Sequence, residues 1–196
     1  MEDHKITRQL LHLVIGIVIL IGLLLVERPL SLIILFVVFL VSVLLAILSR
    51  KIKIPGLYSV ITRLEQREDE KKFPGKGFIF FLAGCLLTVK LFSPDIALAS
   101  IAVLTFGDPI ANITRRALTK KPKRGKHLIG NIFGLIVSFF FAMIFISPVY
   151  AGIAAFIGMA AELIYIKLGQ SQTDDNLIIP LAAGTAVYFF KYIFGA

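Results

Sequence analysis

The chain has 196 residues, of which 58% are hydrophobic and 17% are charged, and its mean hydropathy is +0.90. A soluble globular domain has far less apolar content, so we expect a single integral membrane domain over residues 1–196. The formal net charge of +9 is explained by the basic loops of a membrane protein. No nucleic-acid partner is expected, because no motif combines aromatic and basic residues as such binding requires. A disulfide framework is also excluded, because Cys85 is the only cysteine.

Hydropathy predicts an all-α, polytopic bundle of about seven membrane spans. We expect each span to be a helix, because a helix satisfies its own backbone hydrogen bonds in hydrocarbon. Each is close to the length needed to cross ~30 Å of hydrocarbon. The expected spans cover residues 10–26, 30–48, 77–92, 96–114, 128–146, 149–168 and 177–194.

The distribution of lysine and arginine predicts the orientation of the bundle. Residues 50–76 and residues 115–126 are rich in both, whereas the turns at residues 27–29, 93–95 and 147–148 hold only Arg28. This alternation predicts a multi-pass protein of the cell membrane with a cytoplasmic N-terminus. Between the second and third spans, residues 57–64 have helical apolar spacing. They fit either a short interfacial helix or a loop whose lysines meet anionic lipid.

With this topology, the unusual polar residues gather at the cytoplasmic side. Random placement would have scattered them over both membrane faces. The group consists of Arg8, His12, Asp108, Asn112, Lys126, His127, Glu162, Asp174, Asp175 and Asn176. Small residues four apart, Gly130 with Gly134 and Ala154 with Gly158, are expected to serve close helix packing.

Asp108 is the first candidate functional residue. An acid at membrane depth is costly and usually faces a bundle interior or a water-filled cavity. Gly107 before it permits close backbone approach, and Pro109 after it can free backbone carbonyls or begin a helical turn. Either effect suits an ion or phosphate site, although a lone acid could also pair with a nearby lysine.

Two further acidic positions accompany Asp108 in this layer. Glu162 interrupts an apolar span, and its structural alternative is an ion pair with Lys167 or with a helix N-terminus. Asp174, Asp175 and Asn176 precede the last span, where Asp or Asn also serves as an ordinary N-cap.

The oxygen-rich layer predicts a site for a hard cation and a phosphorylated ligand. Carboxylates without a Cys/His cluster favour Mg²⁺, which needs one or two protein carboxylates plus substrate phosphates. Arg8, Arg116 and Lys126 are suited to hold those phosphates, and His12 shares a helix face with Arg8. For His12, a structural hydrogen bond and a catalytic role stay equally open. Glycine-rich phosphate loops and soluble hydrolase motifs are absent from the sequence.

The chain resembles the CTP-dependent polyprenol kinases, the membrane group that includes dolichol, phytol and CTP-using diacylglycerol kinases. The resemblance runs from Arg8 to Gly184. Its matching elements are Arg8 to His12, Gly107-Asp108-Pro109-Ile110-Ala111, Lys126 to Gly130, Glu162, and Asp175-Asn176-Leu177 with Pro180. The chain departs from the family pattern at Gln9 (usually Lys), Arg115 (usually Gly) and Ile129 (often Glu).

The resemblance implies transfer of the γ-phosphoryl group of CTP to the hydroxyl of a membrane lipid alcohol. It implies that Asp108 binds Mg²⁺ or activates the hydroxyl, and that Glu162 and Asp175 complete the catalytic metal site. The nucleotide or its phosphates would be held by Arg8, His12, Gly107, Arg116, Lys126 and Asn176. The alternatives are a CTP:lipid-phosphate cytidylyltransferase, whose closing signature is not visible, and a lipid or ion transporter, which would place its ionisable residues near the bilayer midplane.

Overall fold

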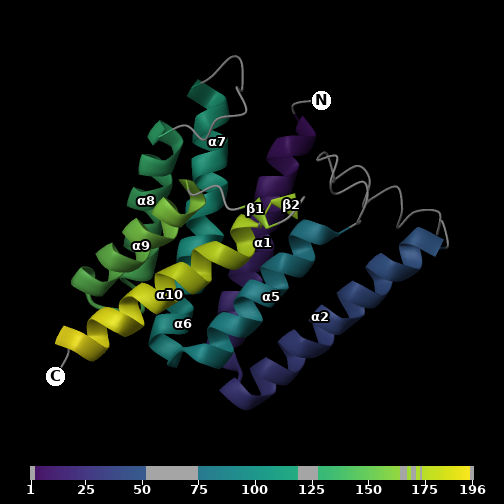
Figure 1. Cartoon of the computed structure of the whole chain (residues 1–196), viewed down its shortest axis with the longest axis horizontal. Coiled ribbons are helices and arrows are strands. Elements are labelled where there is room, and N and C mark those ends of the chain that lie inside the picture. Colours follow the sequence, from purple (N-terminus) through teal and green to yellow (C-terminus); the bar gives the residue numbers. More distant parts are fainter. Residues whose placement is uncertain are drawn as a thin grey trace.

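The computed structural model of the chain describes residues 3–51, 75–118, 128–163, 167–168, 171–172 and 174–194. Residues 57–64, Lys126 and His127 lie outside the described residues. The helices are α1 (Asp3–Leu25), α2 (Arg28–Lys51), α5 (Lys76–Leu91), α6 (Pro94–Ala102), η1 (Val103–Gly107), α7 (Asp108–Leu118), α8 (Leu128–Ala142), α9 (Pro148–Leu163) and α10 (Asp175–Phe194). Between α9 and α10, the two-residue strands β1 (Lys167–Leu168) and β2 (Ser171–Gln172) pair in antiparallel fashion (Figure 1).

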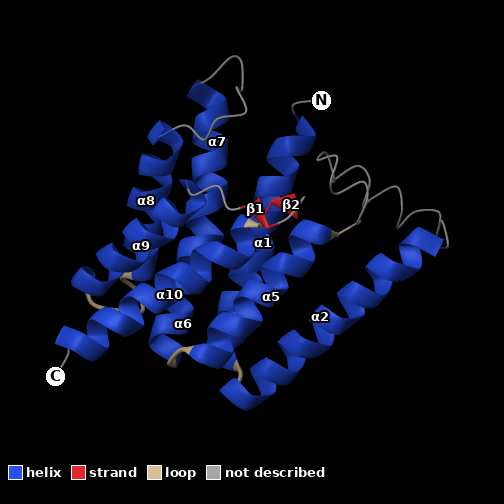
Figure 2. Ribbon diagram, in the orientation of Figure 1, coloured by secondary structure: helices blue, strands red, loops and turns tan. Residues whose placement is uncertain are grey.

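The predicted all-α class is confirmed, and a helix or a helical rod occupies each of the predicted spans (Figure 2). The fourth span is built from α6, η1 and α7, which follow one another without a break. Among the described residues, four helical segments are long and apolar enough to cross a membrane. They are Ile6–Leu25, Arg28–Ser49, Pro94–Leu118 and Asp175–Phe194.

Of the other three helices, α8 and α9 are shorter than the spans predicted from hydropathy, whereas α5 has the length of its predicted span, residues 77–92. α5 and α9 have 16 residues and α8 has 15. At about 1.5 Å per residue they rise about 22–24 Å, less than the ~30 Å of a typical hydrocarbon core. The predicted ends at residues 146 and 168 are therefore wrong. After α8, hydrogen bonds from Ile144 to Phe141 and from Phe145 to Ala142 tighten the chain into a turn before Pro148.

The helix ends separate into two groups. Figure 1 shows the beginning of α1, the end of α7 and the beginning of α8 at one side of the bundle. The short α1–α2, α5–α6 and α8–α9 connections lie at the opposite side. The side with the beginning of α1 is called the N-terminal side below. The short connections agree with the proline-marked turns expected from the sequence.

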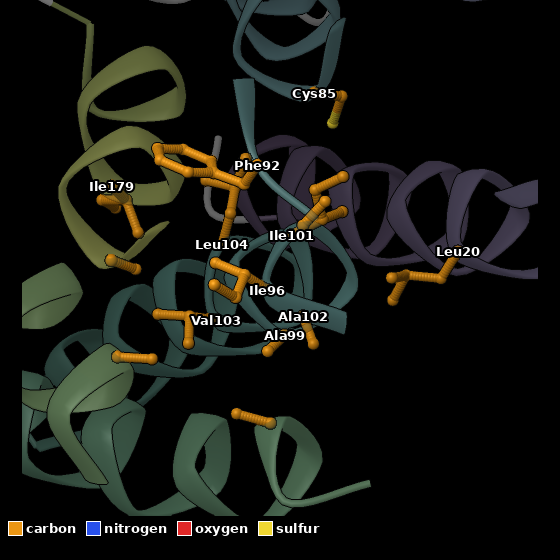
Figure 3. Close-up of a cluster of buried hydrophobic side chains, with 14 of the residues drawn as sticks. Leu20, Cys85, Phe92, Ile96, Ala99, Ile101, Ala102, Val103, Leu104 and Ile179 are labelled. Carbon is orange, nitrogen blue, oxygen red and sulfur yellow. The ribbon is translucent and has the colours of Figure 1, made fainter. Parts of the chain in front are cut away.

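The rod formed by α6, η1 and α7 is the centre of the bundle. In its most apolar window 78% of the residues are buried, against 17% in the windows of α1 and α2. η1 packs against α1, α8, α9 and α10. Figure 3 shows its side chains within the apolar core, whose fully buried members include Ala99, Ile101, Ala102, Val103 and Leu104. α1 and α2 present large apolar side chains outward, as expected for helices that contact lipid.

The central rod contains a π-helical segment, η1, directly before Asp108. Pro109 explains its position. Proline has no backbone N–H to donate to the carbonyl four residues earlier, which belongs to Thr105, and its ring clashes with that carbonyl in a regular α-helix. Widening the preceding turn removes this clash without ending the helix. Pro109 thus places the π-helical segment in the central rod, the most buried helix, directly before Asp108, the only acid of the rod at that depth.

Arg28 connects two of the turns at the side opposite the N-terminal side. Its Nη2 donates to the carbonyl oxygens of Val89 at 2.8 Å, Lys90 at 3.2 Å and Phe92 at 2.9 Å. These carbonyls belong to the end of α5 and the residue after it, where helical hydrogen-bond partners run out. Arg28, the one cation that the sequence places in the charge-poor turns, therefore caps a helix.

We predict that Arg28→Gln lowers stability, because up to three carbonyls lose a charged donor. A loss of about 1–3 kcal/mol is expected. Cys85 is fully buried, so a thiol-reactive fluorogenic dye reports unfolding during a thermal ramp in detergent. The control is Lys191→Gln, which removes an exposed ion pair with Asp95 of 2.8 Å and should cost at most about 1 kcal/mol. Equal midpoints for the two variants would contradict the capping role.

Candidate functional site

Asp108 is the first residue of α7 and is 8% exposed. Its carboxylate oxygen Oδ1 accepts a hydrogen bond of 2.8 Å from Nδ2 of Asn112, one helical turn further on. The same Nδ2 lies 2.9 Å from the Asp108 carbonyl oxygen. This pair of contacts holds the Asp108 side chain against its own helix, which orients the carboxylate.

A series of polar contacts continues from Asp108 to the end of α9. Nη2 of Arg115 donates to Oδ1 of Asn112 and lies 3.7 Å from Oε1 of Glu162. Glu162 is 3% exposed and is the second-to-last residue of α9. We call Asp108, Asn112, Arg115 and Glu162 the α7–α9 polar chain. It joins the two acids that the sequence singled out, through Asn112 and Arg115.

This arrangement corrects two sequence-based interpretations. Glu162 has Arg115 as an ion-pair partner, whereas the structural alternative considered from the sequence was Lys167 or a helix N-terminus. Glu162 was also expected within a span that continues to residue 168, but α9 ends at Leu163. Arg116, the expected phosphate ligand, lies on the exposed side of α7, whereas Arg115 points into the bundle toward Glu162.

Asn131 in α8 supports the last turn of α9. Its Nδ2 donates to the Met159 carbonyl oxygen at 2.8 Å, one turn before Glu162. Its Oδ1 is buried and has no hydrogen-bond partner within the part of the chain that the structure describes. This hydrogen bond ties α8 to the last turn of α9 and so holds the turn that bears Glu162. The only sequence signal for this role of Asn131 was its polar amide side chain, in a span whose glycines were interpreted as packing residues.

Glycines bring α8 close to the central rod beside Asp108. A Cβ on Gly134 would lie 2.6 Å from the Gly107 carbonyl oxygen, and a Cβ on Gly107 would lie 2.5 Å from Sδ of Met159. A Cβ on Gly130 would lie 2.5 Å from the Ala111 carbonyl oxygen. The predicted packing role of Gly130 and Gly134 is confirmed. The close approach that Gly107 permits is to α8 and α9.

The beginning of α10 shows the capping that the sequence suggested. Oδ1 of Asp174 accepts a hydrogen bond of 3.1 Å from the backbone N–H of Asn176, as an N-cap side chain does. Nδ2 of Asn176 donates to the Gly77 carbonyl oxygen at 3.1 Å, and this ties α10 to α5. Asn176, expected at a phosphate, therefore has a structural contact. Asp175 is half-buried in the first turn of α10.

Arg8 and His12 lie on α1, which packs against η1 and α7. The His12 ring meets the Phe81 ring of α5 edge to face, with centroids 4.6 Å apart and an interplanar angle of 70°. It also contacts the Leu104 backbone in η1, and the Asp108 carboxylate is near enough to interact with it electrostatically. His12 and Asp108 therefore lie on two helices, α1 and α7, that pack against each other.

The predicted three-carboxylate metal site is not preformed. No group of three or more His, Cys, Asp or Glu side chains that could hold a metal occurs within the described ranges. Glu162 is engaged with Arg115, and Asp175 belongs to a different helix start. These residues fit Mg²⁺ only in the mode where one or two carboxylates share the ion with substrate phosphates and water.

We predict that Gly134→Ala destabilises the site region, because its added methyl group meets the Gly107 backbone. A loss of about 1–3 kcal/mol is typical of such overpacking. Gly152 is the matched control, because a Cβ there meets nothing nearer than Phe139 at 3.9 Å. Gly152→Ala should be neutral or slightly stabilising, since alanine favours a helix. The thermal dye assay on Cys85 compares the two, and a neutral Gly134→Ala would refute the close packing.

We also predict that Arg115→Leu destabilises the protein by about 1–3 kcal/mol, because it removes the guanidinium group that pairs with the buried Glu162 carboxylate. Arg116→Leu, one residue along on the exposed side of α7, should cost at most about 1 kcal/mol, because interactions of exposed charges are weak. The double variant Arg115→Leu/Glu162→Gln should recover part of the loss, because it removes the buried charge. Additive losses in the same thermal assay would show that the ion pair does not couple α7 to α9.

Comparison with known proteins gives one informative relative. No protein-family model matches the chain, and no solved structure matches it. The chain is 30% identical over 180 residues to the uncharacterized protein MJ1137 of Methanocaldococcus jannaschii. The alignment covers 90% of this chain and 89% of that protein, so it extends over nearly all of both sequences. The chain therefore belongs to the same family as MJ1137 of Methanocaldococcus jannaschii.

Proposed function

We propose that the protein is a CTP-dependent lipid kinase that phosphorylates the hydroxyl of a polyprenol-like or other lipid alcohol at the cytoplasmic membrane face. The observation that supports this most is the α7–α9 polar chain. A buried acid follows a π-helical segment in the central helix and is connected through Asn112 and Arg115 to a second buried acid on another helix. Strongly buried acids in an apolar bundle favour a functional role over a structural one.

The same proposal includes seven membrane crossings with the N-terminus in the cytoplasm. The helix ends alternate between the two sides of the bundle (Figure 1), and in the sequence the basic segments follow the ends of α2 and α7. The three short helices would cross where the bilayer thins locally around the protein. On this topology Arg8, Asp108, Glu162 and Asp175 face the cytoplasm, where CTP is dissolved.

The charges of the described residues suit phosphoryl transfer. This reaction needs mostly positioning and neutralisation of phosphate charge. Arg8 on α1 and Arg116 on α7 are the proposed phosphate ligands, with Lys126 added from the sequence resemblance. Arg115 has a different task, because it holds Glu162. The lipid tail stays in the bilayer, so only the hydroxyl head has to reach the site.

Asp108 is the proposed carboxylate ligand of Mg²⁺, and Glu162 and Asp175 are the other candidates. When bound, the ion would neutralise charge on the β- and γ-phosphates. Asn112 holds one Asp108 oxygen, and we assign the second oxygen to the metal. In the reaction the acceptor oxygen bonds to the γ-phosphorus while the bond to the bridging oxygen of CTP breaks. CDP leaves, and the hydroxyl proton is released.

The test is transfer of labelled phosphate from CTP to a lipid extract by the purified full chain. We expect label in lipid from γ-labelled CTP and none from α-labelled CTP. Asp108→Asn should reduce transfer at least about 100-fold, because it removes the charge that binds the metal. The matched control is Asp95→Asn, an acid at the opposite side that pairs with Lys191, which should keep transfer.

Three results would overturn the proposal. Label from α-labelled CTP alone would identify a cytidylyltransferase. No label from either nucleotide, across extracts that contain polyprenols, phytol and diacylglycerol, would leave no kinase activity to explain. Full turnover by Asp108→Asn would remove Asp108 from the site.

A further inference from the structure

The seam between α1 and η1 has an unusual polar content. Arg8, His12 and Gly16 recur every four residues and therefore share one face of α1. That face meets the central rod. A Cβ on Gly16 would collide with the Thr105 side chain, and the His12 ring contacts the Leu104 backbone. The two helices are therefore in close contact along this seam, one to three turns below the beginning of α1.

Two side chains of the seam have unused hydrogen-bonding capacity. Nε2 of His12 and Oγ1 of Thr105 are buried without a hydrogen-bond partner among the described residues, and Thr105 is fully buried. A helical threonine ordinarily donates to the carbonyl one turn back. An unsatisfied buried polar atom costs about 1–3 kcal/mol. Two such atoms on facing helices indicate a place that a ligand group completes.

The surroundings of His12 indicate what kind of group this is. His12 lies one helical turn deeper than Arg8, and the Phe81 ring closes one side of its imidazole. The charged groups that face it are Asp108 from α7 and Arg8 from α1. A phosphate would be poorly compensated beside an aromatic ring and a carboxylate. A neutral hydroxyl fits, because it gives one hydrogen bond to Nε2 of a neutral imidazole.

α1 separates the seam from the bilayer. The outward faces of α1 present exposed apolar side chains, including Leu10, Val14 and Val18, as a lipid-contacting helix does. These side chains lie on the face of α1 opposite the seam, so the bilayer borders α1 and is available to the tail of a lipid alcohol bound beside it. Its hydroxyl then arrives beside Asp108, since Leu104 lies one helical turn before that residue.

We propose that His12 is the binding residue for the acceptor hydroxyl, with Nε2 accepting its hydrogen bond at the α1–η1 seam. The role of His12 in a reaction rests on the proposed kinase activity. The binding of a hydroxyl by His12 is argued independently, from the contacts at the α1–η1 seam. The inference assigns different residues to the two substrates: Arg8 to the phosphates of the nucleotide and His12 to the hydroxyl of the lipid. It also removes His12 from the phosphate-binding group in which the sequence alone placed it.

The experiment measures binding and turnover separately, with geranylgeraniol and its methyl ether as probes. The ether has the same tail but no hydroxyl hydrogen. Without CTP, we expect geranylgeraniol to raise the thermal midpoint of the wild-type chain more than the ether does. His12→Phe should abolish this preference, and His12→Gln should keep part of it, because the glutamine amide oxygen can accept the same hydrogen bond.

In turnover assays, His12→Phe should raise KM for geranylgeraniol at least about tenfold, the loss of one well-placed hydrogen bond. KM for CTP should change less than about twofold. The control Leu11→Phe alters an exposed neighbour on the same helix and should change neither constant. The thermal midpoint without ligand, followed through Cys85, verifies that each variant is folded.

The outcomes distinguish the inference from the activity on which it rests. If the wild-type chain transfers phosphate but His12→Phe keeps the alcohol preference and both KM values, the inference is wrong and the kinase proposal stands. If the wild-type chain prefers the alcohol through His12 but transfers nothing, the binding site stands and the kinase proposal is wrong. Equal stabilisation of the wild-type chain by alcohol and ether would overturn the inference, because a buried water would then account for Nε2.

Discussion

The structure depends on a constraint that Pro109 imposes on the central helix. Pro109 cannot donate a backbone hydrogen bond to Thr105, so the helix widens into η1 immediately before Asp108. This segment lies at the centre of the bundle, in contact with α1, α8, α9 and α10. A change at Pro109 would therefore alter the orientation of Asp108 and the packing of four neighbours together. The proposed acceptor seam has the same origin, because Leu104 and Thr105 belong to the widened turn.

Close packing and polar contacts support each other around this segment. Gly107 and Gly134 let α8 approach the rod, and this approach places Asn131 within reach of the Met159 carbonyl. Met159 precedes Glu162 by one turn, so the position of α8 helps to set where Glu162 meets Arg115. Small residues are suited to this task in a membrane, where helix association relies on van der Waals contact and hydrogen bonds. The opposite side is organised differently, by Arg28 as a cap for α5.

Much of the fold could be predicted because hydropathy and helical periodicity are local properties. Among the described residues, the helical segments, the proline turns, the N-cap at Asp174 and the glycine packing of α8 follow from short stretches of sequence. The ends of α8 and α9 were not predictable from apolar content. Residues 143–146 remain apolar after the helix has turned, so hydropathy does not register that change.

The sequence by itself determined an all-helical membrane domain and the residue types of its polar layer, including Asp108 and Glu162. Only the tertiary structure decided how those residues are used. In the folded protein Glu162 pairs with Arg115, and Arg116 is exposed. Asn131 donates a hydrogen bond to a carbonyl of α9, and His12 contacts η1. The physical reason is that a side chain's partner depends on the rotation and depth of two helices far apart in sequence. Hydropathy defines where a helix lies along the chain, and packing against its neighbours defines which way each polar residue on it faces.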